Sequence, residues 1–263
     1  QAVLNAMNIA GKNQFLSLSS IGDLSDIDKI DLNVIKDFHQ RVLNEFPKVL
    51  TIVGDVEKID ISDLFSDISM LDFESPYSSS DIEPKRIEEF HSGSQTELIL
   101  LYDIDLEPNS KDSVAMMLYT AYIGQLPTSV LFQEIREKHS LCYSIYANRY
   151  VFDGVFMIHT GIDDKNIDKT IKLIEEELEL QKKGIKNLDG IKKAIISRLE
   201  GSKEDLQSLS SRAFTDLLKN TSYDLDVLKE MIMDVSETDI LNISQRINNP
   251  FIYVYRGEEN EEN

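Results

Sequence analysis

The chain has 263 residues, of which 41% are hydrophobic, a composition typical of a folded globular protein with one large or two medium-sized domains. Its 47 acidic and 27 basic residues give a formal net charge of -20, which argues against DNA or RNA as the main partner, because phosphate binding needs a basic surface. An acidic surface suits a soluble protein, and at low salt it would also attract basic peptides.

The single cysteine, Cys142, excludes a disulfide within the chain and favours a reducing compartment, so we expect a cytoplasmic protein. No apolar run reaches the length of about 18 residues that a membrane span needs, and we expect no membrane contact. The chain begins at Gln1 without a signal-peptide pattern or an initiator methionine, so we expect it to be cut from a longer protein.

The first expected element is a helix over residues 32–43, capped by Asp31 and ended by Pro47. Residues 49–56 (VLTIVGDV) follow as an expected strand, closed by Gly54. The helix is indicated by apolar residues at helical spacing, namely Leu32, Ile35, Phe38 and Val42.

The same helix-then-strand pattern recurs near the other end of the chain. Residues 235–247 form an expected helix, capped by Ser236 with Asp239 in the position where a capping box prefers Glu or Gln. Residues 251–257 form the expected strand that follows. The buried stripe of the helix would consist of Ile240, Ile243 and Ile247.

An internal repeat of about 200 residues therefore predicts two homologous domains. Residues 1–56 would be the C-terminal part of a truncated first domain, and residues 83–263 the second domain. Residues 57–82 would be a linker that ends in a Ser-rich stretch, SPYSSSD. The linker also contains a short amphipathic piece formed by Ile61, Leu64, Phe65 and Ile68.

The second domain alternates strands and helices in an order that predicts its fold class. We expect an α+β fold, in which helices pack on one face of a mostly antiparallel sheet. The expected elements are two strands joined at Ser92-Gly93, an apolar helix over 111–123 ended by Gly124, a short helix over 129–138, a hairpin of 141–150 and 155–162, a long helix starting at Asp163 or Asp164, further helices to about residue 233, and the strand 251–257.

The histidines do not form a zinc motif. No two of them stand at the spacing that places metal ligands on one helix face, so we expect no metal site and no cofactor from this chain alone. His139 is expected to be solvated in a turn, and His159 to be a packed strand residue. The four histidines are His39, His91, His139 and His159.

Arg136 and Tyr143 are the candidate functional residues. Arg136 lies on the short helix, and Tyr143 lies seven residues later on a strand, so both side chains can reach one spot. Such donors stabilise an oxygen that becomes negative during a reaction. The alternative is that Arg136 forms surface ion pairs with Glu134 and Glu137 while Tyr143 is a half-buried strand aromatic. Spacing alone favours this alternative.

The segment LFQEIREKHSLCYSI resembles the signature of the second domain of the insulinase/pitrilysin family of zinc peptidases, which includes mitochondrial processing peptidases. Gly124 resembles the glycine that ends the preceding helix in this family. Ser140 departs from the pattern because the family often has Gly there, and residues 125–128 (QLPT) replace a Gly/Ser-rich stretch. The matching residues are Ser129, Leu131, Phe132, Ile135, Arg136, Glu137, Lys138, Leu141, Tyr143, Ser144 and Ile145.

The resemblance implies that two homologous domains close around an unfolded peptide substrate, with zinc on the first domain. Arg136 and Tyr143 would serve the scissile carbonyl as catalytic residues, and zinc would be held by a homologous partner domain or subunit, in a homo- or heterodimer or in one longer chain. The chain alone would be an inactive, non-zinc domain. The alternative is a non-catalytic structural or interaction subunit with the same fold, and a third hypothesis is an unrelated α+β binding domain.

Overall fold

A computed structural model describes residues 1–55, 74–221 and 224–257. Contacts within the chain divide it into two compact units. The first, which we call the sheet unit, comprises Gln1–Leu18, Tyr77–Arg198 and Asp224–Asn263, and the second, the helical unit, comprises Ser19–Pro76 and Leu199–Tyr223. The domain boundaries expected from the repeat stay a prediction.

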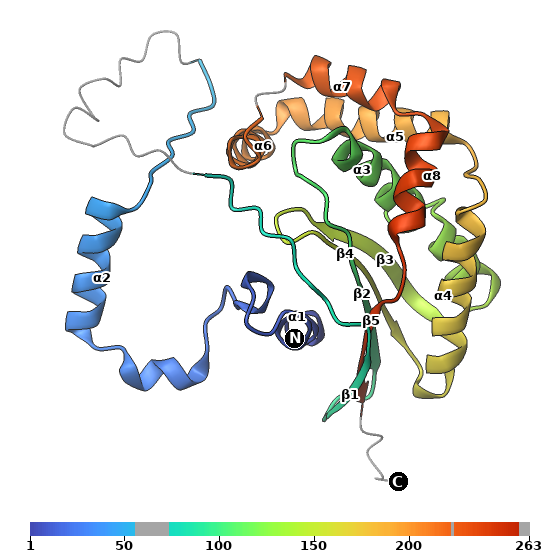
Figure 1. Ribbon diagram of the computed structural model, residues 1–263, viewed down its shortest axis with the longest axis horizontal. Coiled ribbons are helices and arrows are strands. Elements are labelled where there is room, and N and C mark those ends of the chain that lie inside the picture. The colour runs from blue at the N-terminus through green and yellow to red at the C-terminus, as the bar shows by residue number, and fades with distance from the viewer. Residues whose placement is uncertain (56–73, 222–223, 258–263) are drawn as a thin grey trace. The chain divides into compact units, whose positions relative to one another are not determined.

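The sheet unit is built on a five-stranded sheet with the order β1-β5-β2-β4-β3 (Figure 1). The pair β1 and β5 is parallel and the other pairs are antiparallel, which confirms the expected α+β class. The first two strands are consecutive in the chain, yet β5 lies between them. The strands are β1 (Arg86–His91), β2 (Thr96–Asp103), β3 (Cys142–Tyr150), β4 (Val155–Ile162) and β5 (Phe251–Gly257).

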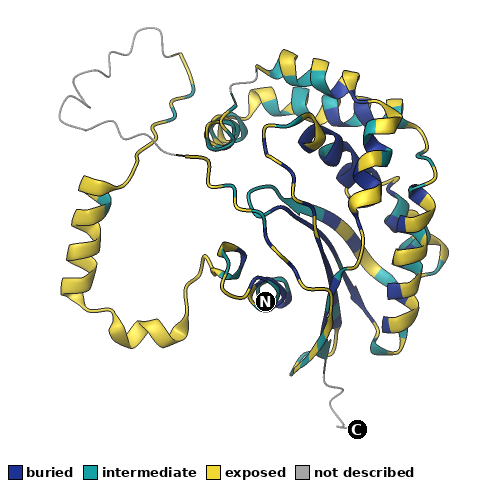
Figure 2. Ribbon diagram, viewed as in Figure 1, coloured by how far each residue is buried: buried dark blue, intermediate teal, exposed yellow. Residues whose placement is uncertain are grey.

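One face of the sheet is covered by helices (Figure 1), and the buried residues of these helices lie mainly on the side towards the sheet (Figure 2). Helix α3 is buried along most of its length, because it packs against β3 on one side and α8 on the other. A helix that is apolar on nearly all sides belongs in the interior of a domain. The helices of this unit include α3 (Lys111–Gly124), α4 (Ile167–Gln181), α7 (Leu225–Asp234), α8 (Glu237–Arg246) and residues 188–198 of α5 (Leu188–Gly201).

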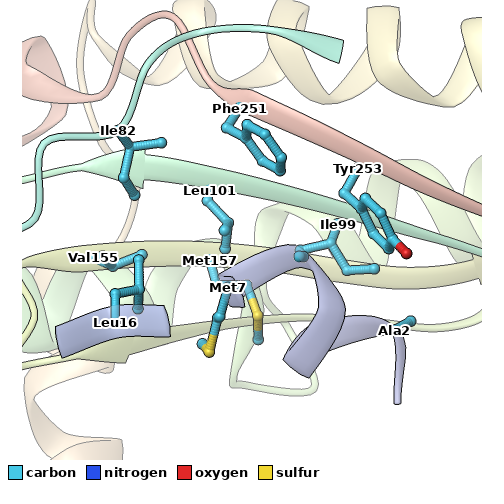
Figure 3. Close-up of a cluster of buried hydrophobic side chains, with 11 residues drawn as sticks. Ala2, Met7, Leu16, Ile82, Ile99, Leu101, Val155, Met157, Phe251 and Tyr253 are labelled. Atoms are coloured by element: carbon cyan, nitrogen blue, oxygen red, sulfur yellow. The ribbon is translucent and has the colours of Figure 1, made fainter. Parts of the chain in front are cut away.

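A further helix, α1 (Ala2–Ala10), packs against the opposite face of the sheet, at β2 and β5. The sequence predicted helices on one face only, so the helix on this side is an addition to the expected arrangement. Figure 3 shows the resulting core, in which Met7 of α1 lies over the alternate residues of the strands. The core cluster consists of Ala2, Ala6, Met7, Leu16, Ile82, Ile99, Leu101, Val155, Met157, Phe251 and Tyr253.

The expected helix caps are present. Asp31 accepts hydrogen bonds from the backbone N–H groups of Asn33 and Val34, which begins α2 (Leu32–Glu45). Ser236 and Asp239 form a reciprocal capping box at the start of α8. Gly124, in contrast, is the last residue of α3 and not a left-handed cap, and Gln125 follows it in a right-handed helical conformation.

The helical unit contains α2, the short helical turn η2 (Leu24–Lys29) and α6 (Leu206–Leu218). The strand expected over residues 49–56 is wrong for its described part, because residues 49–55 form no strand. A strand needs a neighbour for its backbone hydrogen bonds, and the sheet of the sheet unit contains only β1 to β5 among the described residues. The amphipathic piece from Ile61 to Ile68 lies outside the described residues.

Among the described helices, none is long and apolar enough to cross a membrane.

Candidate functional site

Arg136 is held by a short, wide helical turn, η4 (Phe132–Lys138). The backbone N–H of His139 donates to the carbonyl of Glu134 at 3.2 Å, and that of Leu141 donates to the carbonyl of Ile135 at 3.1 Å. Ile135 and Leu131 are completely buried, so η4 is anchored by its apolar side. The anchoring leaves Arg136 on the opposite, solvent-facing side of the turn.

A backbone conformation that is unusual for serine links η4 to β3. Ser140 has a φ of 50°, in the left-handed region that costs a non-glycine residue free energy. At this position the family motif that the sequence resembles often has glycine, whereas this chain has serine. The chain therefore keeps the sharp turn between Arg136 and Tyr143 although it lacks the residue best suited to it.

Tyr143 lies at an irregularity of the sheet, where the pairing of β3 with β4 shifts between Cys142 and Ile145. Its side chain is 88% exposed, so the expectation of a half-buried strand aromatic is wrong. Within residues 1–55, 74–221 and 224–257, nothing hydrogen-bonds to the Tyr143 hydroxyl. A bulge re-aims a strand side chain, and here it turns Tyr143 out of the sheet.

The Arg136 guanidinium is only weakly engaged. Its carbon lies 4.6 Å from the centre of the Phe132 ring, and one of its nitrogens lies 3.7 Å from the carboxylate of Glu137. No hydrogen bond occupies the guanidinium in the part of the chain that the structure describes. A partly exposed ion pair of this kind contributes little free energy, so Arg136 keeps its donors available for a ligand.

Arg136 and Tyr143 line one hollow of about 620 Å³. The hollow therefore brings together the two residues that the sequence singled out, and it presents a permanent positive charge beside an aimed hydroxyl. Such a pair can donate hydrogen bonds to a carbonyl or carboxylate oxygen of a bound peptide. The remaining lining residues are Ser94, Gln95, Glu137, Ser140, Leu141, Cys142, Gly161, Ile162 and Asp163.

Cys142 also borders the hollow as a free thiol. Burial raises its pKa above the ordinary value, which outweighs the hydrogen bond with Thr160 and the nearby charge of Arg136. The thiol form is therefore favoured, and this supports the interpretation of Cys142 as a packed strand residue.

The described residues contain no group of three or more His, Cys, Asp or Glu side chains able to hold a metal ion. These described residues therefore do not fit a zinc site. His139 is not simply solvated as expected, because its Nε2 lies 3.1 Å from the carboxylate of Glu134. Glu134 also accepts a hydrogen bond from Lys138 at 2.6 Å, and its pKa is lowered mainly by that bond.

His159 is packed in the sheet, where it bridges two other polar residues that the sequence did not single out. Its Nε2 lies 2.6 Å from Glu97 of β2, and its Nδ1 lies 2.6 Å from the hydroxyl of Tyr146 on β3. Alternation along each strand places such residues on one face, but their proximity depends on the strand order, which no local pattern specifies.

Most of this chain matches the model of a known protein family. Residues 29–194 match the model described as the Peptidase M16 inactive domain. A relative from Bacillus subtilis, "Probable inactive metalloprotease YmfF", is 21% identical over 257 residues, which cover 94% of this chain and 60% of the relative. The chain thus spans less than two thirds of that protein.

Solved structures share the fold. The peptidase M16 inactive domain from Pseudomonas fluorescens has a TM-score of 0.81 at 19% identity, over 100% of this chain and 66% of that chain. A chain of Complex III2 from Candida albicans has a TM-score of 0.74 at 12% identity, over 97% of this chain and 66% of that chain. At these identities, the likeness concerns the fold alone.

Proposed function

This chain belongs to the M16 (pitrilysin) peptidase family as an inactive-type domain, and from this premise we propose that it binds unfolded peptide and supplies Arg136 and Tyr143 to the scissile carbonyl. The observation that carries the proposal is the shared hollow, which both side chains line with donors that no described residue hydrogen-bonds. A tetrahedral oxyanion needs such donors at positions set before the reaction. Arg136 provides a fixed charge, and Tyr143 provides a directed O–H group.

In this proposal, the metal chemistry belongs to a homologous domain or subunit. This chain binds the peptide, orients its carbonyl and stabilises negative charge on the oxygen. Loss of one donor of this kind typically lowers turnover about 100- to 1000-fold. The isolated chain is expected to be inactive.

An exposed apolar helix supports the need for such a partner. In the expected repeat, α2 corresponds to α8. Phe38 then corresponds to Ile243, because both stand at the same place in the apolar stripe of their helix. Ile243 is 1% exposed whereas Phe38 is 54% exposed. Figure 2 shows the same contrast along the two helices. Since the same pattern is buried against α3 in one copy, we propose that α2 packs in the same manner against an α3-like helix of the homologous partner.

The test uses the peptidase formed with the zinc-bearing partner. Arg136→Ala and Tyr143→Phe are expected to lower kcat at least about 100-fold with little change in peptide affinity. Tyr77→Phe, on the edge of the same unit, serves as the matched control and should leave kcat unchanged. Equal losses of kcat and affinity would assign the two residues a binding or folding role, and zinc-dependent cleavage by the chain alone would refute the proposed division of labour.

A non-catalytic interaction subunit is the second candidate. It is favoured by the relative named an inactive metalloprotease and by the relative that is part of Complex III2. In that case, Arg136→Ala would leave every activity of the assembled complex unchanged, and only its assembly would depend on this chain.

A further inference from the structure

A hydrogen-bonded row of three side chains crosses three strands on the sheet face that carries α1. We call it the polar row: Glu97 of β2, His159 of β4 and Tyr146 of β3. The carboxylate of Glu97 lies 2.6 Å from His159 Nε2, and the hydroxyl of Tyr146 lies 2.6 Å from His159 Nδ1. The Tyr146 and His159 rings meet edge to face with centres 5.0 Å apart. Both imidazole nitrogens are thus occupied.

The polar row lies between the α1 core and the hollow. Alternation along β4 puts Met157, His159 and Gly161 on the same face. Met157 belongs to the core under α1, as Figure 3 shows, and Gly161 lines the hollow. His159 therefore lies between the core residue Met157 and the hollow residue Gly161 on one face of β4, two residues from each. Tyr146 is 40% exposed, and the register with His159 places it on this same face of the sheet.

The partners of His159 determine where its proton is. The hydrogen bond with His159 holds the pKa of Glu97 below its usual range, so Glu97 is an ionised carboxylate that can only accept hydrogen bonds. His159 Nε2 must then carry a hydrogen. In the neutral imidazole, Nδ1 is consequently an acceptor, and the Tyr146 hydroxyl donates to it. Its oxygen lone pair remains free to accept a further hydrogen bond.

We propose that Tyr146 is an additional peptide-binding residue, whose oxygen accepts a hydrogen bond from a backbone N–H of the bound peptide. The inference rests on the proposed peptide binding. Because the Tyr146 O–H group is directed at His159 Nδ1, a lone pair of its oxygen is left for the peptide.

The surrounding charged groups do not take the place of His159 as the hydrogen-bond partner of the Tyr146 hydroxyl. Glu97 and Tyr146 face it from the two neighbouring strands, and the more distant His91 acts electrostatically on Glu97. His91 is engaged elsewhere, because it stacks on Tyr255 with ring centres 4.2 Å apart and contacts the Gln95 carbonyl at 3.0 Å. His159 is the group that contacts the Tyr146 hydroxyl directly.

The test measures binding of a fluorescein-labelled unfolded casein peptide to the 263-residue chain by anisotropy, at about pH 8 and constant ionic strength. Tyr146→Phe should weaken binding about 2- to 12-fold, as expected for one lost neutral hydrogen bond. Tyr150→Phe, on the same strand and face, is the matched control and should behave as wild type.

A second measurement examines the row without peptide. NMR of the ¹⁵N-labelled His159 ring should show the hydrogen on Nε2 at neutral pH. A hydrogen on Nδ1 instead would overturn the inference. Binding that is equally strong in Tyr146→Phe would overturn it too, but would leave peptide binding intact. Absence of peptide binding to the wild-type chain would refute the proposed function, and this inference with it.

Discussion

Gly124 lies so close to Ala147 that no side chain fits between them. A Cβ atom placed on Gly124 would be 2.4 Å from the backbone nitrogen of Ala147 and 2.7 Å from its Cβ. The contact joins the end of the buried helix α3 to β3, the strand that carries Tyr143. The glycine therefore sets how closely the central helix approaches the strand of the candidate site.

Gly124→Ala is expected to lower the free energy of unfolding by about 2–3 kcal/mol, because backbone must move to make room for the added methyl group. Urea denaturation followed by circular dichroism measures this change. Gly201→Ala is the matched control, since Gly201 is helical and nothing lies within 4 Å of an added Cβ. There the substitution should stabilise by about 0.5–1 kcal/mol. Similar effects at both positions would contradict the role given to Gly124.

Ser140→Gly is expected to stabilise the protein, because Ser140 has a φ of 50°. Relief of the left-handed strain exceeds the extra chain entropy of glycine, and we expect a gain of about 0.5–1 kcal/mol. Ser211→Gly, in the interior of α6, should instead cost about 0.5–1 kcal/mol. Differential scanning calorimetry would show opposite shifts of Tm. A lower Tm for Ser140→Gly would mean that the serine side chain itself stabilises the turn.

Asp239→Asn tests the capping box by its pH dependence. Hydrogen bonds from the backbone N–H and hydroxyl of Ser236, with Lys111 at 3.0 Å, lower the pKa of Asp239 from 3.8 to about 2. Since the folded-state pKa is the lower one, the stabilisation is complete above the unfolded value and is lost as the pH falls from about 4 towards 2. We expect Asp239→Asn to cost about 1 kcal/mol at pH 7.

The difference between wild type and Asp239→Asn should shrink in acid, which urea titrations at several pH values would show. Asp189→Asn is the control, because Asp189 also lies in the first turn of a helix but has no capping contact among the described residues. A pH-independent cost for Asp239→Asn would attribute the effect to packing and not to the carboxylate.

Local features of this fold could be predicted from the sequence, and features that depend on distant pairing could not. The caps Asp31 and Ser236 and the strand β5 were predicted because each is a property of neighbouring residues. The position of β5 between β1 and β2, the packing of α1 and the polar row depend on contacts between segments far apart in the chain. No periodicity encodes those contacts.

The candidate site likewise has features that could be predicted from the sequence and features that could not. Arg136 and Tyr143 could be predicted because a motif places them on either side of one turn, and the structure brings both to one hollow. The exposure of Tyr143 could not be predicted, because it results from the pairing shift between β3 and β4. Their catalytic role stays a prediction, which kinetics of the assembled peptidase must decide.

The helices α2 and α8 offer a direct test of the proposed missing partner. Ile243 is buried against the core of the sheet unit, and its replacement by Ala should lower the free energy of unfolding of the isolated chain by about 2–4 kcal/mol. Phe38 is exposed on α2, and Phe38→Ala should change the free energy of unfolding by less than about 0.5 kcal/mol.

In the complex with the proposed zinc-bearing partner, Phe38→Ala should weaken association at least about 10-fold, because a buried aromatic is then lost. Analytical ultracentrifugation of the chain with its partner measures the change, and equal association of wild type and Phe38→Ala would exclude α2 from the interface.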